Sequence, residues 1–529
     1  MSSRYRALGG DRGYGERVRA LAARTARAVR SDPGSVAALL VLAAALLAGL
    51  VRYARTVAYG LTTPYAFEYG EGFMLYFATH LGAMYEPVGI EPFLPTVYPP
   101  LYHLLVGGLH WLVGDRIGLF ALGRSVSVAA AVATALLVAA LVRASAADAG
   151  DGGTVDGRWS AVAGVVAAGV FLSTPLTLQW GVAARVTILG LCLSVAAVYW
   201  YLAAADGSRR QVAGCALLCL LALYAKQSFV AAPLSIALAF LLAGHRRRAA
   251  EFVLSLGAAG LLLLAALAAA TDGQAWYHLV VYNSSQSVEL ARIAEFAARF
   301  VVAYPILLAL GGAVVLHRRS LVPTVVLVYL VAAGAVAVAT VGKPGSNDYY
   351  FFETVTALCV VAGCALAAAL SPDRRLFGSG ATPAARTLVV LILVAQVGLF
   401  LPGTPVDEPT GAAATAATIE GADGPVLTED NSLLVALDRT PTHEPFLTTQ
   451  LAAAGTWDQT PVVRSIEEGR YSYVVLLFDV EGDPTHHADR WTDAQLEAIA
   501  EHYELAERNG DYRVYVPASE TERPDGESS

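Results

Sequence analysis

The sequence predicts an all-α polytopic membrane protein with about 11 transmembrane helices and two juxtamembrane helices, ending in a small C-terminal α/β soluble domain. Three observations support this class. The 529 residues are 56% hydrophobic and only 15% charged, with a mean hydropathy of +0.53, and soluble proteins carry more charge. Apolar runs close to the length that crosses about 30 Å of hydrocarbon recur along the chain. Beyond Pro405 the composition becomes polar and acidic.

The predicted spans follow the apolar runs. They are residues 36–51, 119–142, 161–178, 186–205, 212–225, 229–243, 252–270, 300–316, 321–341, 351–370 and 387–401. One further run, residues 98–114, is a candidate for another crossing. Arginine and lysine concentrate in short cytoplasmic loops. The basic clusters share one side only if residues 98–114 lie along the membrane surface. These clusters are residues 17–30, 209–210, 246–248, 318–319 and 374–375.

The run at residues 98–114 also has the composition of a surface helix. His103, Gly107 and His110 recur at helical spacing, opposite Leu104 and Leu105. The stretch before it is similar, since apolar side chains at helical spacing share one face. They are Phe73, Phe77, Leu81 and Met84. Two juxtamembrane helices are therefore expected between the first and second spans.

Four segments follow from this topology. Residues 1–35 are a basic cytoplasmic arm, residues 36–402 are the transmembrane domain with an outside loop at 52–118, residues 403–517 are an acidic extracytoplasmic domain, and residues 518–529 are a disordered tail. The part beyond Pro405 carries a net charge of −18 and the rest +10. In the acidic domain we expect strands at 426–428, 473–478 and 512–516 and a helix at 493–502.

Two features of the composition point to the source and limit the chemistry. Arginine supplies nearly all the positive charge, and with the acidic domain this is typical of a salt-adapted haloarchaeon. The cysteines lie inside apolar runs with no zinc-site spacing, so neither a disulfide nor a metal site is inferred from them.

The first outside loop carries the candidate catalytic residues. Glu68 and Glu71 are three residues apart, just before an amphipathic helix, so both can face one cavity. A partly desolvated carboxylate at a membrane interface suits a general base. The alternative is structural, because negative charge is favoured at a helix N-terminus.

The cations of the outer face are few. Arg124, Arg185, Lys226 and Lys343 lie at span ends or in outside loops, and the two lysines are the only ones in the chain. Each alone is explained by anchoring at the membrane edge. Together they predict a cationic rim for a phosphate or pyrophosphate head group. Further polar residues are predicted to contact the substrate, namely Gln227, Asn347, Tyr350, Glu353 (as a partner of Lys343 or Arg185) and His103.

The chain resembles the GT-C class of membrane glycosyltransferases, in particular the group of the protein O-mannosyltransferases and the aminoarabinose transferase of lipid A. The resemblance covers roughly residues 67–353. It rests on the acidic first outside loop, the two juxtamembrane helices, Tyr98-Pro99-Pro100-Leu101 and the turn Ala184-Arg185-Val186-Thr187. The C-terminal part is similar to the outside α/β domain of some prokaryotic members.

The resemblance implies transfer of a sugar from a polyprenyl (dolichyl) phosphate donor to a glycan or protein acceptor outside the membrane, in surface glycan or glycoprotein assembly. It places Glu71 at the catalytic acid position with Glu68 as neighbour or substitute. Arg124 and Arg185 take the place of the arginines that face the outer cavity in the class. The pattern differs in the two separated glutamates and in Thr187, where members often have Asp. The base and a divalent cation (Mg or Mn) therefore stay open.

Alternatives remain at this level. A lipid or solute transporter or flippase would also need intramembrane polar groups, and these gather instead at one face. A scaffold whose acidic tail binds partners, or a glycan polymerase or ligase, is the other option. No nucleotide-binding domain is evident, as expected for a lipid-linked donor, and nothing points to nucleic acid. The expected location is the cell membrane, with a cytoplasmic N-terminus and an extracellular C-terminal domain.

Overall fold

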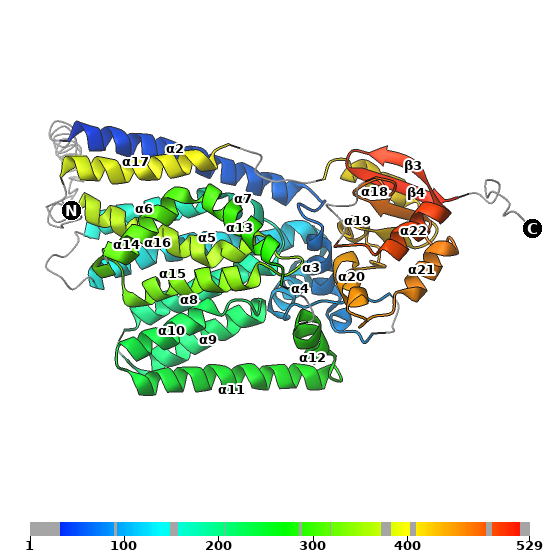
Figure 1. Ribbon diagram of the computed structural model, residues 1–529, viewed down its shortest axis with the longest axis horizontal. Coiled ribbons are helices and arrows are strands. Elements are labelled where there is room, and N and C mark those ends of the chain that lie inside the picture. Colours follow the sequence, from blue (N-terminus) through cyan, green and yellow to red (C-terminus); the bar gives the residue numbers. More distant parts are fainter. Residues whose placement is uncertain are drawn as a thin grey trace, which may run out of the picture.

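The computed structural model describes residues 32–88, 92–148, 157–205, 207–284, 288–317, 319–371, 382–402, 409–482 and 489–518. Figure 1 shows a body of long helices lying side by side and a smaller α/β domain at one end. Most of the predicted basic arm and almost all of the predicted disordered tail fall outside the described residues.

Each predicted span coincides with helical structure. The helices of the body are α2 (Pro33–Thr62), α5 (Leu119–Asp148), α6 (Gly157–Ser173), α8 (Val186–Ala203), α9 (Arg209–Ala225), α10 (Ala231–Leu242), α11 (Arg246–Ala270), α14 (Pro305–His317), α15 (Thr324–Thr340), α16 (Phe352–Leu370) and α17 (Pro383–Phe400). By length and composition, 6 helices among the described residues can cross a membrane, or up to 7 if a bent pair forms one span. The chain is thus a multi-pass membrane protein.

Two predicted spans are interrupted at prolines. The run at 161–178 divides into α6 and α7 (Pro175–Trp180), because Thr174 caps the N-terminus of α7 and Pro175 occupies its first turn. The run at 300–316 is also not one helix. α13 (Leu290–Ala303) meets α14 at Pro305 with a bend of 90°. The two helices of this run are therefore nearly perpendicular to each other.

The juxtamembrane helices α3 (Gly70–Thr79) and α4 (Leu101–Val113) pack against each other. α3 is shorter than expected and ends before Leu81, which lies in a 3-10 turn, η1 (Leu81–Ala83). It is buried along nearly its whole length. In α4 the face with Gly107 rests on the α3 carbonyl of Ala78, and Leu105 and Leu112 on the opposite face are exposed. The glycine face packs inward and the apolar face points out.

The C-terminal domain contains a four-stranded sheet of order β1-β2-β4-β3. β1 and β2 are parallel, and the other neighbours are antiparallel. The expected helix is α22 (Asp493–His502). β3 and the short helices of this domain were not predicted. The elements are α18 (Ala412–Glu420), β1 (Val426–Thr428), α19 (Ser432–Ala436), α20 (Pro445–Ala453), α21 (Thr460–Glu467), β2 (Tyr473–Leu476), β3 (Tyr503–Asn509) and β4 (Tyr512–Pro517). The predicted class, a helical membrane body with a small α/β domain, is confirmed.

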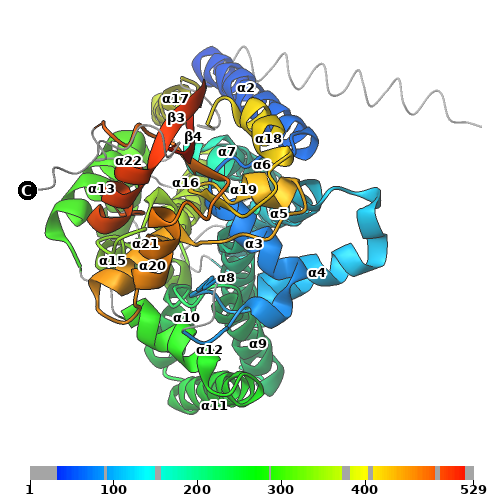
Figure 2. The ribbon, with the colours of Figure 1, turned by 90° about the vertical axis from the view of Figure 1, so that its right-hand side faces the viewer.

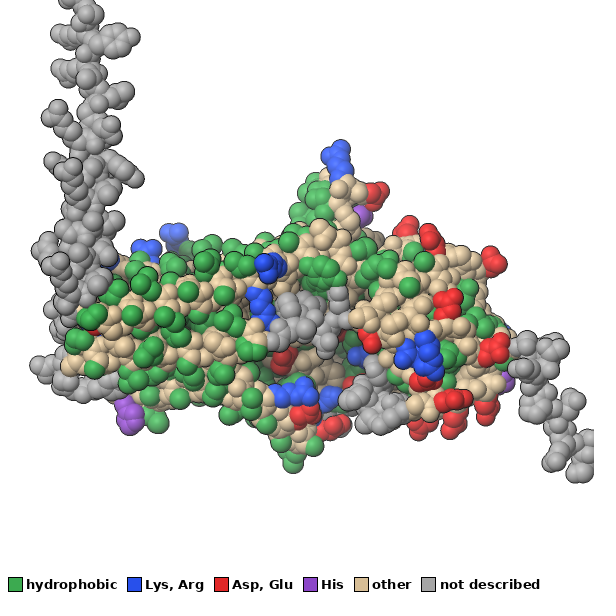
Figure 3. Space-filling model, turned by 90° about the horizontal axis from the view of Figure 1, so that it is seen from above, with side chains coloured by type: hydrophobic (Ala, Val, Ile, Leu, Met, Phe, Trp, Pro, Cys, Tyr) green, Lys and Arg blue, Asp and Glu red, His purple; other side chains and the backbone are tan. Residues whose placement is uncertain are grey.

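The two parts also differ at their surfaces. Among the described residues, the large hydrophobic side chains that are exposed all lie between Leu40 and Leu399, in the helical body and its loops. Figure 3 shows hydrophobic side chains spread over the body and acidic ones gathered on the C-terminal domain. In Figure 2 this domain lies in front of the helix ends. One part has a surface suited to lipid and the other a surface suited to water.

Candidate functional site

Glu71 is enclosed at the beginning of α3. Its side chain is fully buried, and both carboxylate oxygens are occupied. Oε1 accepts hydrogen bonds from Arg124 Nε at 3.0 Å and the Ala184 amide at 2.5 Å. Oε2 accepts from Arg124 Nη2 at 2.7 Å and the Phe67 amide at 2.6 Å. Protein groups surround the Glu71 carboxylate, so its environment indicates a structural role.

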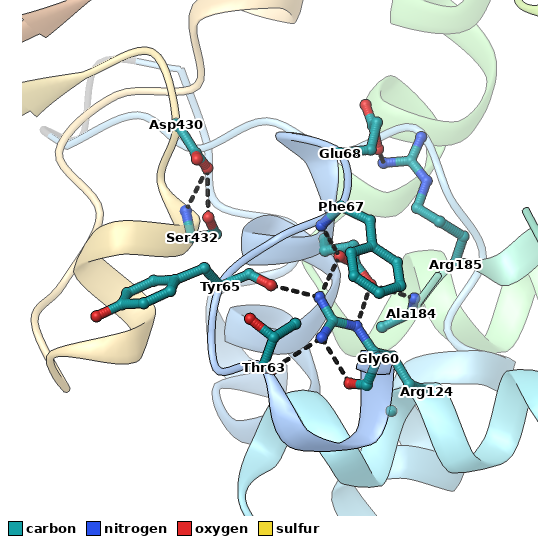
Figure 4. A network of polar contacts seen from close by, with 12 residues as sticks. Gly60, Thr63, Tyr65, Phe67, Glu68, Arg124, Ala184, Arg185, Asp430 and Ser432 are labelled. Carbon is teal, nitrogen blue, oxygen red and sulfur yellow. Dashed lines mark hydrogen bonds and ion pairs between the residues drawn. The ribbon is translucent and has the colours of Figure 1, made fainter. Parts of the chain in front are cut away.

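Arg124 of α5 completes this buried cluster. Its guanidinium also donates to backbone carbonyls at the end of α2 and in the loop that follows, and it stacks on the Phe67 ring at 4.1 Å. The accepting carbonyls belong to Gly60 (2.8 Å), Thr63 (2.9 Å) and Tyr65 (2.6 Å), as Figure 4 shows. Because arginine presents its donors in a rigid fork, this one residue joins α2, α5 and the first outside loop.

Glu68 lies apart from that cluster, as Figure 4 also shows. Its carboxylate pairs with Arg185 Nη1 at 3.0 Å, and the two side chains keep 19% and 10% exposure. Gly70 makes this approach possible, since a Cβ there would lie 1.8 Å from Arg185 Nη1. The two carboxylates, three residues apart, thus have different surroundings. Glu71 is enclosed by protein, and Glu68 lines an open chamber.

The C-terminal domain packs directly on α3. At Gly72 an added Cβ would lie 2.5 Å from the Ser432 backbone nitrogen. The Arg490 guanidinium lies over the Tyr69 ring at 4.0 Å and pairs with the buried Glu429 at 2.5 Å. Arg490 was not predicted, because nothing local in the sequence relates it to residues more than 400 positions earlier. This domain supplies part of the site wall.

Three adjoining chambers open where the two parts meet. The first, here called the polar chamber, has a volume of about 640 Å³ and lies between the first outside loop, α13 and the C-terminal domain. Its walls combine acids, arginines and amides, including Glu68, Arg185, Arg292, Asn347 and Arg490. Such a wall offers many hydrogen-bond donors and acceptors, which suits a hydrophilic ligand.

The second, the lysine chamber, has a volume of about 280 Å³ and brings together Lys226, Gln227, Lys343 and Tyr350. Lys226 is 5% exposed, lies 4.1 Å from the centre of the Tyr349 ring, and has no salt bridge to a carboxylate among the described residues. A buried ammonium without a counter-ion is costly, so an anionic group that entered would be favoured. Val336 of α15, Val230 and Phe446 add an apolar part to the wall, so a lipid-linked anion fits its chemistry.

The third, the central chamber, is small, at about 80 Å³. It shares Tyr69 and Arg185 with the polar chamber and Val97 and Tyr98 with the lysine chamber. Glu444 of the C-terminal domain is the acid in its wall. Burial raises the pKa of this carboxyl to about 7. The central chamber therefore adjoins both the cationic chamber and the polar one, and all three share Gly345 and Phe446 in their walls.

Three residues predicted to contact the substrate lie away from these chambers. Arg124, expected in the cationic rim for a phosphate, is buried against Glu71 and lines none of them. Glu353 was expected to pair with Lys343 or Arg185, but its Oε1 accepts from Ser194 Oγ at 2.5 Å and Tyr329 OH at 3.1 Å inside the helix bundle. This pairing expectation is wrong, because Glu353 in the first turn of α16 points to the hydroxyl groups of α8 and α15.

His103 is fully buried in α4, edge-on to Phe77, and lines none of the three chambers. Among the described residues there is no group of three or more His, Cys, Asp or Glu that could hold a metal ion. The predicted site residues that the structure brings together are therefore those of the chambers: Glu68, Arg185, Lys226, Gln227, Lys343, Asn347 and Tyr350.

Comparison with known proteins identifies the fold. No protein-family model and no curated protein sequence matches the chain. Among solved structures, ArnT from Cupriavidus metallidurans bound to undecaprenyl phosphate is 14% identical, with 92% of this chain and 99% of that chain covered and a TM-score of 0.55. Its apo form gives 15% identity, coverage of 90% and 97%, and a TM-score of 0.50.

The apo oligosaccharyltransferase from Archaeoglobus fulgidus is 13% identical, with 92% of this chain and 75% of that chain covered and a TM-score of 0.51. Both neighbours are GT-C glycosyltransferases. At these identities the similarity concerns the fold, and it extends over the membrane body and the C-terminal domain together. The chain adopts the fold of the GT-C glycosyltransferases.

Proposed function

We propose that this protein is a glycosyltransferase that moves a sugar from a polyprenyl phosphate donor, such as a dolichyl phosphate sugar, to a glycan or protein acceptor on the outer face of the membrane. The observation that carries the proposal is the pairing of two chambers: Glu68 lines one, and the buried Lys226 lines the next. A base for the acceptor and a cation for the departing phosphate are the two groups that such a transfer needs.

In the proposed step the acceptor hydroxyl binds in the polar chamber and gives its proton to the Glu68 carboxylate. Its oxygen forms a bond to the anomeric carbon while the bond from that carbon to the phosphate oxygen breaks. The electron pair stays on the polyprenyl phosphate, where Lys226 and Arg185 stabilise the charge. A single displacement of this kind inverts the anomeric configuration.

Glu68 is favoured over Glu71 as the base by accessibility. Glu71 is fully buried, and its oxygens already accept four hydrogen bonds, so an acceptor hydroxyl has no route to it. Glu68 keeps 19% exposure toward the polar chamber. In this proposal Glu71 is a positioning residue that holds the first outside loop against Arg124.

The proposed orientation has the chambers outside. Lys226 directly follows α9, which begins at Arg209, so this basic pair lies about 25 Å away at the other end of the helix. Arg246 likewise begins α11. Basic residues at the end remote from the chambers favour that end as the cytoplasmic one. The lipid donor is supported by the ArnT neighbour, which was solved with undecaprenyl phosphate bound.

The test compares Glu68→Gln with the wild type and with Glu251→Gln, which removes a carboxylate on α11 paired with Arg247 and Arg248. Each would be supplied to a strain that lacks the gene, and surface glycans and glycoproteins would be measured by mass spectrometry. We expect glycans truncated by one sugar with Glu68→Gln and complete glycans with Glu251→Gln.

In purified protein, the rate of transfer should fall by about 100-fold or more in Glu68→Gln. Normal transfer in this variant would eliminate Glu68 as the base. Complete glycans in the deletion strain, with a polyprenyl lipid redistributed across the membrane, would favour a flippase instead.

A further inference from the structure

The central chamber is placed where the transferred sugar would lie. It adjoins the lysine chamber through Val97 and Tyr98 and the polar chamber through Tyr69 and Arg185. A sugar whose phosphate enters the lysine chamber would extend into it, with the acceptor on its other side. At about 80 Å³ it is far below the roughly 300–1,000 Å³ of sites for drug-sized ligands, so it has room for no more than one ring.

Its walls have two kinds of chemistry. One side is apolar, formed by Phe73, Met74 and Phe77 of α3. The other side carries Arg185 and the C-terminal domain residue Glu444. A sugar ring likewise has an apolar C–H face and an edge of hydroxyl groups. Arg185 is already paired with Glu68, so among the charged side chains that line this chamber the one left for the hydroxyl edge is Glu444.

Glu444 is an unusual choice for its local role. It is the N-cap of α20, where its carboxylate accepts a hydrogen bond from the Leu447 amide. Ser, Thr, Asp and Asn are the preferred caps, and α22 of the same domain has Thr492. A carboxylate costs more to bury than a neutral hydroxyl cap, and Glu444 is only 8% exposed with no salt bridge among the described residues. Capping alone does not account for a buried glutamate here.

We infer that Glu444 is a specificity-determining residue whose carboxylate binds the hydroxyl groups of a neutral sugar held in the central chamber. This inference rests on the proposed function. It makes the C-terminal domain a part of the donor site, with lipid phosphate recognised by the membrane body and sugar recognised by the acidic domain.

Glu444→Ser tests this directly, because serine keeps the cap of α20 while it removes the carboxylate. The matched control is Thr492→Ala, which removes the cap of α22 without touching the chambers. KM for the polyprenyl phosphate sugar, kcat and the affinity for polyprenyl phosphate without sugar would be measured on the full chain in detergent.

We expect Glu444→Ser to raise KM for the sugar donor by about 10- to 100-fold, the loss typical of a hydrogen bond to a charged group, and to leave the affinity for bare polyprenyl phosphate unchanged. Thr492→Ala should lower the unfolding temperature and leave KM unchanged.

Three results would overturn the inference: a wild-type KM in Glu444→Ser, an equal change of KM in both variants, or weaker binding of bare polyprenyl phosphate. If the wild type itself transfers no sugar, the proposed function fails instead. The two failures are therefore distinguishable.

Discussion

The membrane body and the C-terminal domain expose different kinds of side chain, because one has a surface suited to lipid and the other a surface suited to water. The chain before Pro405, with its basic N-terminal arm included, carries a net charge of +10, and the body exposes leucine and valine. The part beyond Pro405 carries −18 and exposes no large hydrophobic residue among those described. Lipid tolerates apolar surface and excludes charge, so many charges in the body are internal or near helix ends. Water favours charged surface and disfavours apolar surface. The chambers therefore lie at the one place where both kinds of surface are available.

The largest effect is expected from the buried ion pair of the membrane body, Arg124 with Glu71. Arg124→Met leaves Glu71 as a buried carboxylate without its cation, and both side chains are fully buried. We expect the free energy of unfolding in detergent to fall by about 3–5 kcal/mol. Arg116→Met, at the exposed turn before α5, is the control and should unfold like the wild type. Equal stability of the two variants would show that Glu71 does not depend on this pair.

Two neighbouring residues of the acidic domain, His443 and Glu444, should contribute to stability with opposite dependence on pH. Burial lowers the pKa of His443 to about 3 and raises that of Glu444 to about 7. The native state binds fewer protons at His443 than the unfolded chain does, so its contribution to stability rises with pH between about 3 and 6.5. Glu444 holds its proton longer in the native state, so its contribution falls as pH rises from about 4.5 to 7.

The two contributions oppose each other in the wild type between about pH 4.5 and 6.5. Glu444→Gln removes the contribution to stability that falls as pH rises. The stability of the wild type relative to this variant should therefore drop by about 3 kcal/mol from pH 4.5 to pH 7. Unfolding of the full chain can be followed by the fluorescence of Trp457 and Trp491, which lie beside His443. A difference that does not change with pH would contradict the burial of Glu444.

The contact between the two parts should be the most tolerant of change. In Gly72→Ala the new methyl group would meet the Ser432 backbone, which cannot move as a side chain can. We expect a loss of about 1–3 kcal/mol, as for other overpacked sites, and faster proteolysis of the C-terminal domain. Gly82→Ala adds the same atom where nothing lies within 4 Å and should behave as the wild type. Unchanged proteolysis of Gly72→Ala would mean that the domain does not rest on α3.

Much of this architecture follows from local pattern. Apolar runs locate the helices of the body because a helix in lipid satisfies its own backbone hydrogen bonds and needs only an apolar exterior. The strand β1 was predicted residue for residue, since a short apolar segment between turn residues has few alternatives. The helix break at Pro175 and the bend at Pro305 do not follow from hydropathy alone, because a proline inside an apolar run interrupts the helix without lowering the apolar character of the run.

Composition and spacing along the chain are enough to specify the membrane body, the acidic domain and a short list of charged residues for the outer face. The roles of those residues depend on the tertiary structure. Glu68 and Glu71 are three residues apart and chemically identical, yet Arg124 encloses one while Gly70 lets Arg185 hold the other at a chamber. Glu444 and Arg490 reach the same place from a distant part of the chain. Accessibility and burial come from packing, which no local spacing contains.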